Sequence, residues 1–379
     1  MGVGLYIHVP FCLTRCHFCA FYFQIYRQDA AQAFLAALRR EIQLHAERKT
    51  LSGRSLDTVY FGGGTPTTLD SRALSEILGL VRDQYGLKDD AEVTLEAHPE
   101  TVTADGLAHL AEAGVNRVSM GVQSADPGEL AQVGRATSWG SVSTAVSWAR
   151  SAHIENINLD LIYGLPGQSL KSWQLTLDEA LVLTPTHISC YALTVEDDTT
   201  LKAKVLRGQV LGPDTKIQNS MEDLAADQLS QAGYDHYEIS NYCRPDYACR
   251  HNLLYWQGGE YLGLGPSAQS YVQGCRFGTV DDLRIYAREL QQGRLPVRDL
   301  EQLTPAQQWR EAIVFGLRLM SGVNLDVGSS PRPHDAGDST WEARLSHLTH
   351  HGLVERQKNQ LKLTSRGRRV ADSVAVELF

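Results

Sequence analysis

Three cysteines lie close together near the start of the chain, Cys12, Cys16 and Cys19, in the pattern C-x3-C-x2-C. Thiolates bind soft metals, and iron–sulfur clusters take cysteine ligands at short spacings. A [4Fe–4S] cluster held only by protein needs four thiolates, so three local ligands would leave one iron open to a substrate or cofactor. The spacing therefore predicts a [4Fe–4S] cluster on these three residues.

Two other interpretations of the cysteines remain open at this stage. Structural zinc takes four ligands, usually in paired Cys or His spacings, and His17 could complete such a site although little chain separates it from its neighbours. Three buried cysteines without a metal would be unusual in a loop flanked by Pro10 and Arg15. A disulfide framework is disfavoured because no secretion signal precedes the seven cysteines.

The elements that must position these cysteines alternate between strand-like and helix-like patterns over the first 200 residues. Six short apolar segments predict strands: Gly4–Val9, Asp57–Phe61, Glu92–Glu96, Arg117–Val122, Asn156–Tyr163 and His187–Leu193. Between them lie five helical patterns: Asp29–Arg48, Asp70–Tyr85, Thr103–Ala113, Trp139–Ser151 and Ser169–Leu183. Parallel neighbours need helical crossovers, so the order predicts a parallel sheet in an α/β fold.

The position of the glycine run distinguishes two ways of arranging this sheet. In a dinucleotide-binding sheet the glycines follow the first strand. Here the cysteines follow the first strand, and Gly62-Gly63-Gly64 follows the second. Polar and glycine signals recur after nearly every strand, as in barrels whose sites collect at the carboxyl ends of the strands. We therefore expect a partial (β/α)6 barrel of the TIM type.

The rest of the chain divides into two further segments, giving predicted units 1–200, 201–300 and 301–379. The middle segment is less regular, with a helix at Asp214–Ala232 and a short strand at His236–Ile239. Tyr261–Ala268 fits a turn-rich loop and equally a strand terminus with tight bends. The last segment reads helix, helix, β-hairpin, helix, with helices at Thr304–Met320 and Trp341–His351, a loop at Ser329–Asp338 and hairpin strands at Leu353–Arg356 and Leu361–Leu363. This order predicts a small, mainly helical, winged-helix-like C-terminal domain.

Charge and hydropathy exclude several classes of function. The 379 residues carry 35 Lys and Arg against 44 Asp and Glu, a net charge of −9. Affinity for nucleic acid depends on clustered cations, so we expect no nucleic-acid partner. The sequence has neither a secretory leader nor an apolar run long enough for a transmembrane segment. We expect a cytoplasmic protein, with peripheral membrane association left open.

The cysteine loop and the glycine run together resemble the radical S-adenosylmethionine (SAM) enzymes. The resemblance rests on C-x3-C-x2-C after a first strand, on Phe18 just before the third cysteine, and on Gly62-Gly63-Gly64-Thr65-Pro66 after the second strand. It implies a radical SAM barrel in which SAM chelates the open iron. In that superfamily the reduced cluster cleaves SAM to a 5′-deoxyadenosyl radical.

One subgroup is most similar, the oxygen-independent coproporphyrinogen III oxidases with their HemW-type relatives. By this resemblance Tyr6, Gly63 and Glu96 would contact the SAM on the cluster. A second SAM or an adjacent ligand would be lined by Phe18, Gly64, Thr65, Gln123, Arg135 and Asp160. No catalytic side chain is assigned.

Two features bear on which member of the subgroup the chain resembles. The oxidases continue to a fourth cysteine as C-x-C, whereas this sequence has Phe21 at that place. His251-Asn252-Leu253-Leu254-Tyr255-Trp256 is similar to the HNxxYW signature of the HemW type, which implies haem binding by His251 and Tyr255. Imidazole and phenol oxygen are both haem ligands, and on a helix these two residues would share a face.

Three functions therefore compete, and whether the chain is an enzyme stays open. The first is a haem chaperone that carries a cluster and SAM and delivers haem to an acceptor haemoprotein. The second is oxygen-independent coproporphyrinogen III oxidase, and the third is another SAM-radical enzyme acting on a tetrapyrrole. HNxxYW together with Phe21 favours the first.

Overall fold

A twelve-stranded mixed sheet organises the computed structural model, which describes residues 2–326 and 339–379. The strand order is β14-β13-β12-β11-β1-β4-β5-β6-β7-β8-β10-β9. The central strands are β11 (Glu260–Leu264), β1 (Val3–Val9), β4 (Leu56–Gly63), β5 (Leu87–Ala97), β6 (Arg117–Gln123), β7 (Asn156–Tyr163) and β8 (His187–Ala192). These seven strands pair in parallel, and the six predicted strands are all among them.

Antiparallel strands extend this sheet at both edges, so the barrel stays open. One edge carries β12 (Gln269–Val272), β13 (Cys275–Thr279) and β14 (Val297–Gln302), and the other carries β10 (Asn241–Cys243) and β9 (Asp235–Glu238). The prediction of a partial barrel is confirmed. Of the two interpretations of Tyr261–Ala268, the strand terminus is correct for the first half: residues up to Leu264 form β11, which pairs with β1 from Val3↔Glu260 to Ile7↔Leu264.

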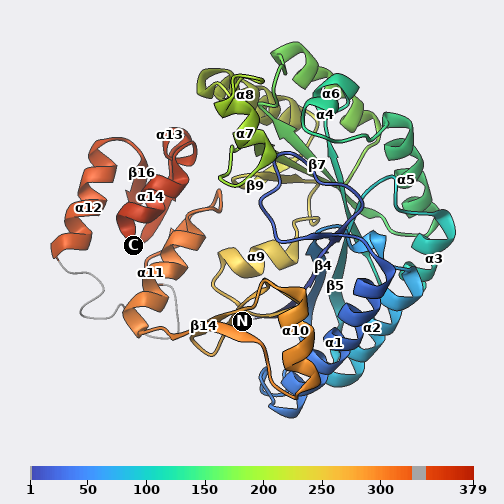
Figure 1. The fold of residues 1–379 in the computed structure, drawn as a ribbon. Coiled ribbons are helices and arrows are strands. Elements are labelled where there is room, and N and C mark those ends of the chain that lie inside the picture. The colour runs from blue at the N-terminus through green and yellow to red at the C-terminus, as the bar shows by residue number, and fades with distance from the viewer. Residues whose placement is uncertain (1, 327–338) are drawn as a thin grey trace.

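Helices cover the outer face of the parallel strands, on the right-hand side of Figure 1. They are α1 (Gln28–Glu47), α2 (Ser71–Tyr85), α3 (Ala104–Glu112), α5 (Trp139–Ser151) and α6 (Leu170–Val182). All five were predicted from the sequence, and four begin at a side-chain cap, for example Ser169 in a capping box with Ser172. Capping signals are local, which is why the sequence located these helices.

Each parallel strand presents an apolar face outward and a polar face inward. In β5 the outward residues Val93 and Leu95 are buried against the helices, whereas Glu92, Thr94 and Glu96 alternate with them. Side chains alternate across a strand, so this period of two separates the core from the lumen of the barrel. The alternation recurs in β4, β6 and β7 and makes the interior of the barrel polar.

Several short elements of the first and middle segments were not predicted from the sequence. They are α4 (Pro127–Gln132), α7 (Thr200–Leu206), α9 (Arg250–Trp256), α10 (Leu283–Gln291), the 3-10 turn η1 (Pro66–Thr68) and the strand pair β2 (Phe11–Cys12) and β3 (Gln24–Ile25). The predicted helix at Asp214–Ala232 is present as α8 (Thr215–Gln231). Short elements carry too few residues for a clear period, so tertiary contacts decide them.

The last segment packs around its own apolar cluster beside the sheet. It contains α11 (Pro305–Gly316), β15 (Val323–Asn324), α12 (Ser339–His350), β16 (Val354–Gln357), β17 (Gln360–Leu363), α13 (Ser365–Arg368) and α14 (Ala371–Leu378). The first helix ends earlier than the predicted Met320, because the Arg318 carbonyl and the Met320 N–H bond to Ile239 and Tyr237 instead. The predicted loop at Ser329–Asp338 lies wholly outside the described residues.

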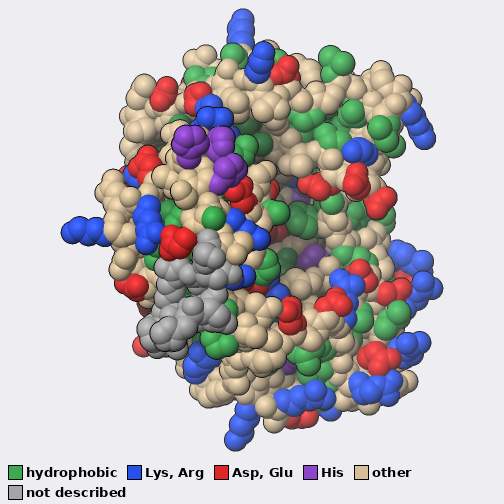
Figure 2. Space-filling view, turned by 90° about the vertical axis from the view of Figure 1, so that its left-hand side faces the viewer, with side chains coloured by type: hydrophobic (Ala, Val, Ile, Leu, Met, Phe, Trp, Pro, Cys, Tyr) green, Lys and Arg blue, Asp and Glu red, His purple; other side chains and the backbone are tan. Residues whose placement is uncertain are grey.

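The surface agrees with the charge analysis. On the face shown in Figure 2, acidic and basic side chains are mixed, with no continuous basic area. Among the helices of the described residues, none combines the length and apolarity that crossing a bilayer requires.

Candidate functional site

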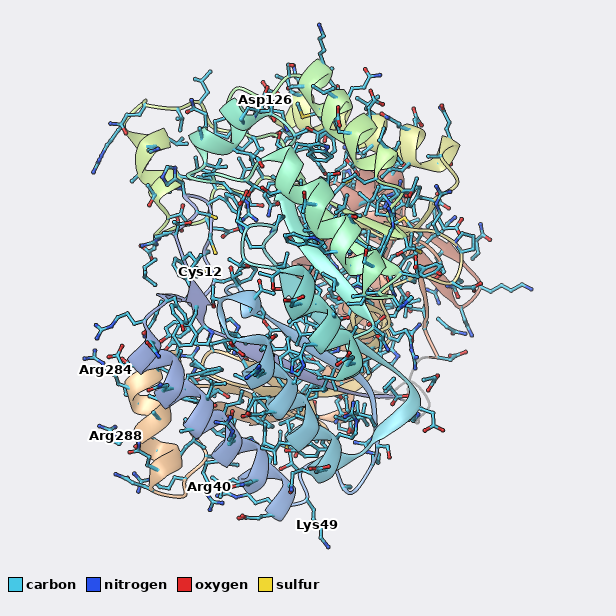
Figure 3. The ribbon with its side chains drawn as sticks, turned by 90° about the vertical axis from the view of Figure 1, so that its right-hand side faces the viewer. Cys12, Arg40, Lys49, Asp126, Arg284 and Arg288 are labelled. Carbon is cyan, nitrogen blue, oxygen red and sulfur yellow. The ribbon has the colours of Figure 1, made fainter. Side chains whose placement is uncertain are left out.

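The cysteine loop leaves the barrel where β1 ends. Cys12 lies in β2, which pairs in parallel with β3, and its carbonyl accepts the Tyr26 N–H at 2.9 Å. Between these strands the chain turns outward and carries Cys16 and Cys19, whose N–H points to the Cys16 carbonyl at 3.4 Å. Figure 3 shows Cys12 between the two halves of the open barrel. The loop therefore stands at the carboxyl ends of the strands.

His17 anchors the cysteine loop to two of the unpredicted helices. Its N–H donates to the Val133 carbonyl after α4 at 2.8 Å, and its carbonyl accepts the Leu201 N–H of α7 at 2.7 Å. Its ring Nδ1 lies 3.0 Å from the Gln132 carbonyl and 3.1 Å from Lys204 Nζ. This ring position argues against the zinc alternative.

The three cysteines are partly buried, and burial acts on the thiol pKa of two of them. Burial raises the pKa of Cys12 to about 11 and also raises the pKa of Cys19, and neighbouring thiols raise both further. Thr65 Oγ1 and Arg135 Nη1 each lie 3.6 Å from a sulfur, on Cys12 and Cys16 respectively. Thiolates held together would repel one another, so a cation must replace their protons. Three such donors fit a cluster with one iron left open.

The glycine run forms a close-fitting cradle beside the cysteines. Gly63 has φ +112°, and a Cβ there would lie 2.6 Å from His8 Nδ1. A Cβ on Gly64 would lie 2.6 Å from the Phe11 carbonyl oxygen. Backbone bonds fix the run, since the Gly64 and Thr65 N–H groups donate to the Val9 and Phe11 carbonyls. Only glycine fits at these two positions, because a Cβ would collide with the His8 ring or with the Phe11 backbone.

Glu96 closes one side of this cradle. Its Oε2 accepts the Gly63 N–H at 3.1 Å, and its Oε1 accepts the Tyr60 hydroxyl at 2.9 Å. Burial, followed by the negative charge of Asp160, raises the pKa of Glu96 to about 7. Tyr6 lies against Tyr60, with ring centroids 6.0 Å apart. The structure thus brings together Tyr6, Gly63 and Glu96, the three residues assigned to the first SAM. The positive ammonium group of SAM would neutralise the negative charge of the Glu96 carboxylate.

The residues assigned to a second ligand gather on the neighbouring strands. Gln123 ends β6 at a bulge with φ +71°, a strained backbone that re-aims its side chain. Arg135 Nη2 donates to the Gly121 carbonyl while its Nη1 faces Cys16. Asp160 lies deeper and accepts bonds from Ser119 and Asn158, both at 2.9 Å. Together these three side chains form a polar wall, and the charge of Asp160 acts on Glu96, where it raises the pKa.

Two phenylalanines of the cysteine loop behave differently. Phe18 packs against an apolar cluster that includes Val133 and Leu201, so it joins the loop to the wall of the barrel. Phe21, at the place of the oxidases' fourth cysteine, is 72% exposed. Its ring offers no metal ligand.

His251 and Tyr255 lie on one face of α9, as predicted, but their polar atoms bond to each other. The Nε2 of His251 lies 2.7 Å from the Tyr255 hydroxyl, and Nδ1 lies 2.7 Å from Thr58 Oγ1. His251 is 1% exposed, and burial lowers its pKa to about 3. Haem ligation by either residue stays a prediction, and it requires these bonds to open. Cys249 is fully buried and points to Glu92.

Sequence reasoning missed the other polar residues of the lumen. They are Thr58, Tyr60, Glu92, Arg117, Ser119, Asn158, His187 and Ser189. A signal for them exists, because each occupies the alternate positions of an otherwise apolar strand. Arg117 is 2% exposed, and within the described residues its Nε has no hydrogen-bond partner.

Comparisons with known proteins agree with this geometry. The family model of the radical SAM superfamily matches residues 6–180. The heme chaperone HemW of Mycobacterium tuberculosis is 38% identical over 380 residues, covering 99% of this chain and 94% of the relative. HemW of Bacillus subtilis is 32% identical, covering 97% of each chain. The solved structure of coproporphyrinogen III oxidase (HemN) from Escherichia coli aligns with a TM-score of 0.86 at 25% identity, covering 100% of this chain and 90% of that one.

Proposed function

The chain belongs to the radical SAM superfamily and, within it, to the family of the heme chaperone HemW, and on this premise we propose that it binds haem and delivers it to an acceptor haemoprotein. The observation that carries the proposal is similarity to HemW over nearly the whole of both chains. We place this function in the cytoplasm.

The cofactor sites follow from the residues at the mouth of the barrel. Cys12, Cys16 and Cys19 hold a [4Fe–4S] cluster, and Tyr6, Gly63 and Glu96 hold the methionine end of SAM. When bound, the cluster supplies a reducible iron with an open coordination position. Glu96 would pair with the ammonium group of SAM. Gly63, which has no room for a side chain, would lie beside this group and keep its N–H on the Glu96 carboxylate.

The second ligand site includes the polar wall of Gln123, Arg135 and Asp160. It consists of Phe18, Gly64, Thr65, Gln123, Arg135 and Asp160. Arg135 is the cation of this group and suits a carboxylate, whereas Asp160 suits a hydroxyl or ammonium donor. A second SAM carries groups of both kinds.

The oxidase is the alternative that the likeness to HemN keeps open. Against it stands Phe21, which is apolar and exposed where the oxidases have a fourth cysteine. A phenyl ring neither ligates metal nor exchanges protons. A SAM-radical reaction on another tetrapyrrole is the third function, and an intact SAM site is what supports it.

Parallel assays on one anaerobically reconstituted sample separate these three functions. For the chaperone we expect a Soret band on titration with haemin and transfer of that haem to a haem-free cytochrome b. Coproporphyrinogen III should not be converted to protoporphyrinogen IX. Rapid decarboxylation without a Soret band would assign the oxidase instead. Formation of 5′-deoxyadenosine that depends on haem, with haem consumed, would assign the third function.

A further inference from the structure

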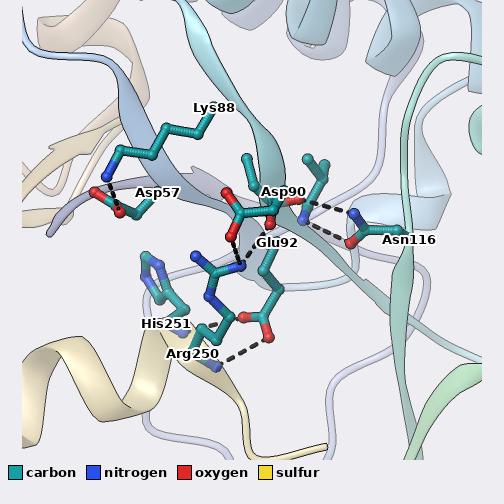
Figure 4. A network of polar contacts seen from close by, with 9 residues as sticks. Asp57, Lys88, Asp90, Glu92, Asn116, Arg250 and His251 are labelled. Carbon is teal, nitrogen blue, oxygen red and sulfur yellow. Dashed lines mark hydrogen bonds and ion pairs between the residues drawn. The ribbon is translucent and has the colours of Figure 1, made fainter. Parts of the chain in front are cut away.

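The helix that bears the HNxxYW signature is fixed to the floor of the barrel by the strand that also carries Glu96. At the lower end of β5, Glu92 Oε1 accepts the His251 N–H at 3.0 Å and Oε2 accepts the Arg250 N–H at 2.9 Å (Figure 4). A carboxylate at a helix start satisfies N–H groups that have no partner within the helix. One strand thus holds α9 with Glu92 and the glycine run with Glu96.

His251 stands in a single orientation above this attachment. Both ring nitrogens are bonded, to Thr58 Oγ1 and to the Tyr255 hydroxyl, each at 2.7 Å. Hydroxyl groups both donate and accept, so either tautomer of the neutral ring is satisfied. Gly4 allows the close approach, since a Cβ there would lie 3.2 Å from His251 Cε1. A ring fixed at both nitrogens and by the backbone has no freedom to turn.

The face of this fixed ring supports Tyr60. The two rings are stacked, with centroids 5.0 Å apart and an interplanar angle of 29°. The Tyr60 hydroxyl then donates to Glu96 Oε1 at 2.9 Å, and Glu96 Oε2 accepts the Gly63 N–H at 3.1 Å. Gly62 packs directly against the rings of Tyr6 and Tyr60, since a Cβ at this position would lie only 3.0 Å from each ring. The contacts run without interruption from α9 to the cradle.

We propose that His251 and Tyr60 are positioning residues of the SAM site, in which the His251 ring holds Tyr60 against Glu96 and so fixes the carboxylate for the ammonium group of SAM. The inference rests on the proposed SAM site and gives the histidine of HNxxYW a role other than haem ligation. Binding of SAM is then coupled to the conformation of α9. Removing either support leaves Glu96 present but free to turn away from the cradle.

The experiment measures SAM binding, iron content and haem binding on the same reconstituted full-length variants. SAM affinity is followed by the EPR spectrum of the reduced cluster during titration with SAM. The variants are His251→Ala, which removes the ring, and Tyr60→Phe, which removes only the hydroxyl. Gln257→Ala is the matched control at the end of the same helix, because this side chain is exposed and lies outside the HNxxYW signature.

For both variants we expect about tenfold weaker SAM binding, the size of losing one hydrogen bond to a charged group. Iron content and the Soret band should stay at wild-type levels, and Gln257→Ala should behave as wild type. His251→Phe, which restores a ring against Tyr60, should recover affinity relative to His251→Ala. If His251→Ala does not fold, Tyr60→Phe decides alone.

Other results would overturn the inference in distinguishable ways. Wild-type SAM affinity in both variants would mean that Glu96 needs no support. A lost Soret band with an unchanged SAM response in His251→Ala would make His251 a haem ligand. A wild-type cluster whose EPR spectrum ignores SAM would overturn the SAM site itself, and this inference with it.

Discussion

Arg135 places its Nη1 3.6 Å from Cys16 Sγ, across 119 residues of sequence. Its Nη2 donates to the Gly121 carbonyl, so the guanidinium is fixed to the end of β6 rather than to the cysteine loop. A fixed cation beside a cluster ligand stabilises the more negative, reduced state, because reduction potentials depend on nearby charge and on hydrogen bonds to sulfur.

Arg135→Met should therefore make the midpoint potential of the cluster more negative. The measurement is a redox titration monitored by EPR, with Arg39→Met on the outer helix α1 as the control. The control should leave the potential unchanged, because exposed charges far from the cluster are screened. An unchanged potential in Arg135→Met would show that the 3.6 Å contact does not persist once the cluster is bound.

The cysteine loop predicts the metal content directly. Reconstituted protein should hold about four iron and four sulfide per chain, and replacing any of Cys12, Cys16 or Cys19 by Ala should abolish stable cluster binding. Cys275→Ala is the matched control, since this thiol lies far along the chain near Gln302. Iron analysis and the visible spectrum check the result. A Cys16→Ala protein that keeps its colour and iron would contradict it.

Gly63 should tolerate no side chain. Gly63→Ala places a Cβ 2.6 Å from His8 Nδ1 at φ +112°, so the cradle must shift. We expect the SAM-dependent change in the EPR spectrum to be lost while iron content is retained. Gly79→Ala in α2 is the control, because a Cβ there meets nothing within 4 Å, and Ala should stabilise this helix by up to about 1 kcal/mol.

Glu96 should make SAM binding depend on pH. Burial and the charge of Asp160 raise its pKa to about 7, against the hydrogen bonds from Tyr60 and Gly63 and the charge of Arg117, which lower it. The ammonium group of SAM needs the carboxylate form, which is lost as the pH falls through 7. Affinity at pH 6 should be about tenfold weaker than at pH 8, one pKa unit being a factor of ten. Glu96→Gln should bind weakly at both pH values, and a pH-dependent Glu96→Gln would point to another group.

Glu41 should make the stability of the fold depend on pH in the opposite sense to an ordinary carboxylate. It is buried in α1, accepts the Gly265 N–H and the Tyr286 hydroxyl, each at 2.7 Å, and has its pKa raised to about 7. The unfolded carboxyl titrates near pH 4.5. Between these values the folded state retains a proton that the unfolded state releases, so stability falls as the pH rises, by about 3 kcal/mol in all.

Denaturant unfolding at pH 5 and pH 8 tests this difference. Glu41→Gln should lose most of the change between the two pH values and should be more stable than the wild type at pH 8. Glu76→Gln, an exposed carboxylate on α2, is the control and should shift stability by less than about 1 kcal/mol. Identical pH dependence in Glu41→Gln and the wild type would mean that Glu41 is ionised in the folded protein.

The sequence by itself determined the elements whose signals are local. The apolar runs of β1 and β7, the caps of α2 and α6, and the spacing of the three cysteines each lie within a few residues of chain. Such signals depend on side-chain alternation, capping bonds and ligand reach, which neighbouring residues supply. They were sufficient for the partial barrel and for the place of the cluster loop.

Only the tertiary structure decided which distant residues meet. Residues Glu260–Leu264 form the strand β11 because they pair with β1, which lies some 250 residues earlier in the chain. In the same way, the Thr58 hydroxyl bonds to the His251 ring across 193 residues of sequence. The HNxxYW spacing places His251 and Tyr255 on one face if the segment is helical, but it could not predict that the segment is a helix or that this face turns into the barrel. A period along the chain states which residues lie together on an element, whereas the partner of that face depends on the packing of the whole sheet.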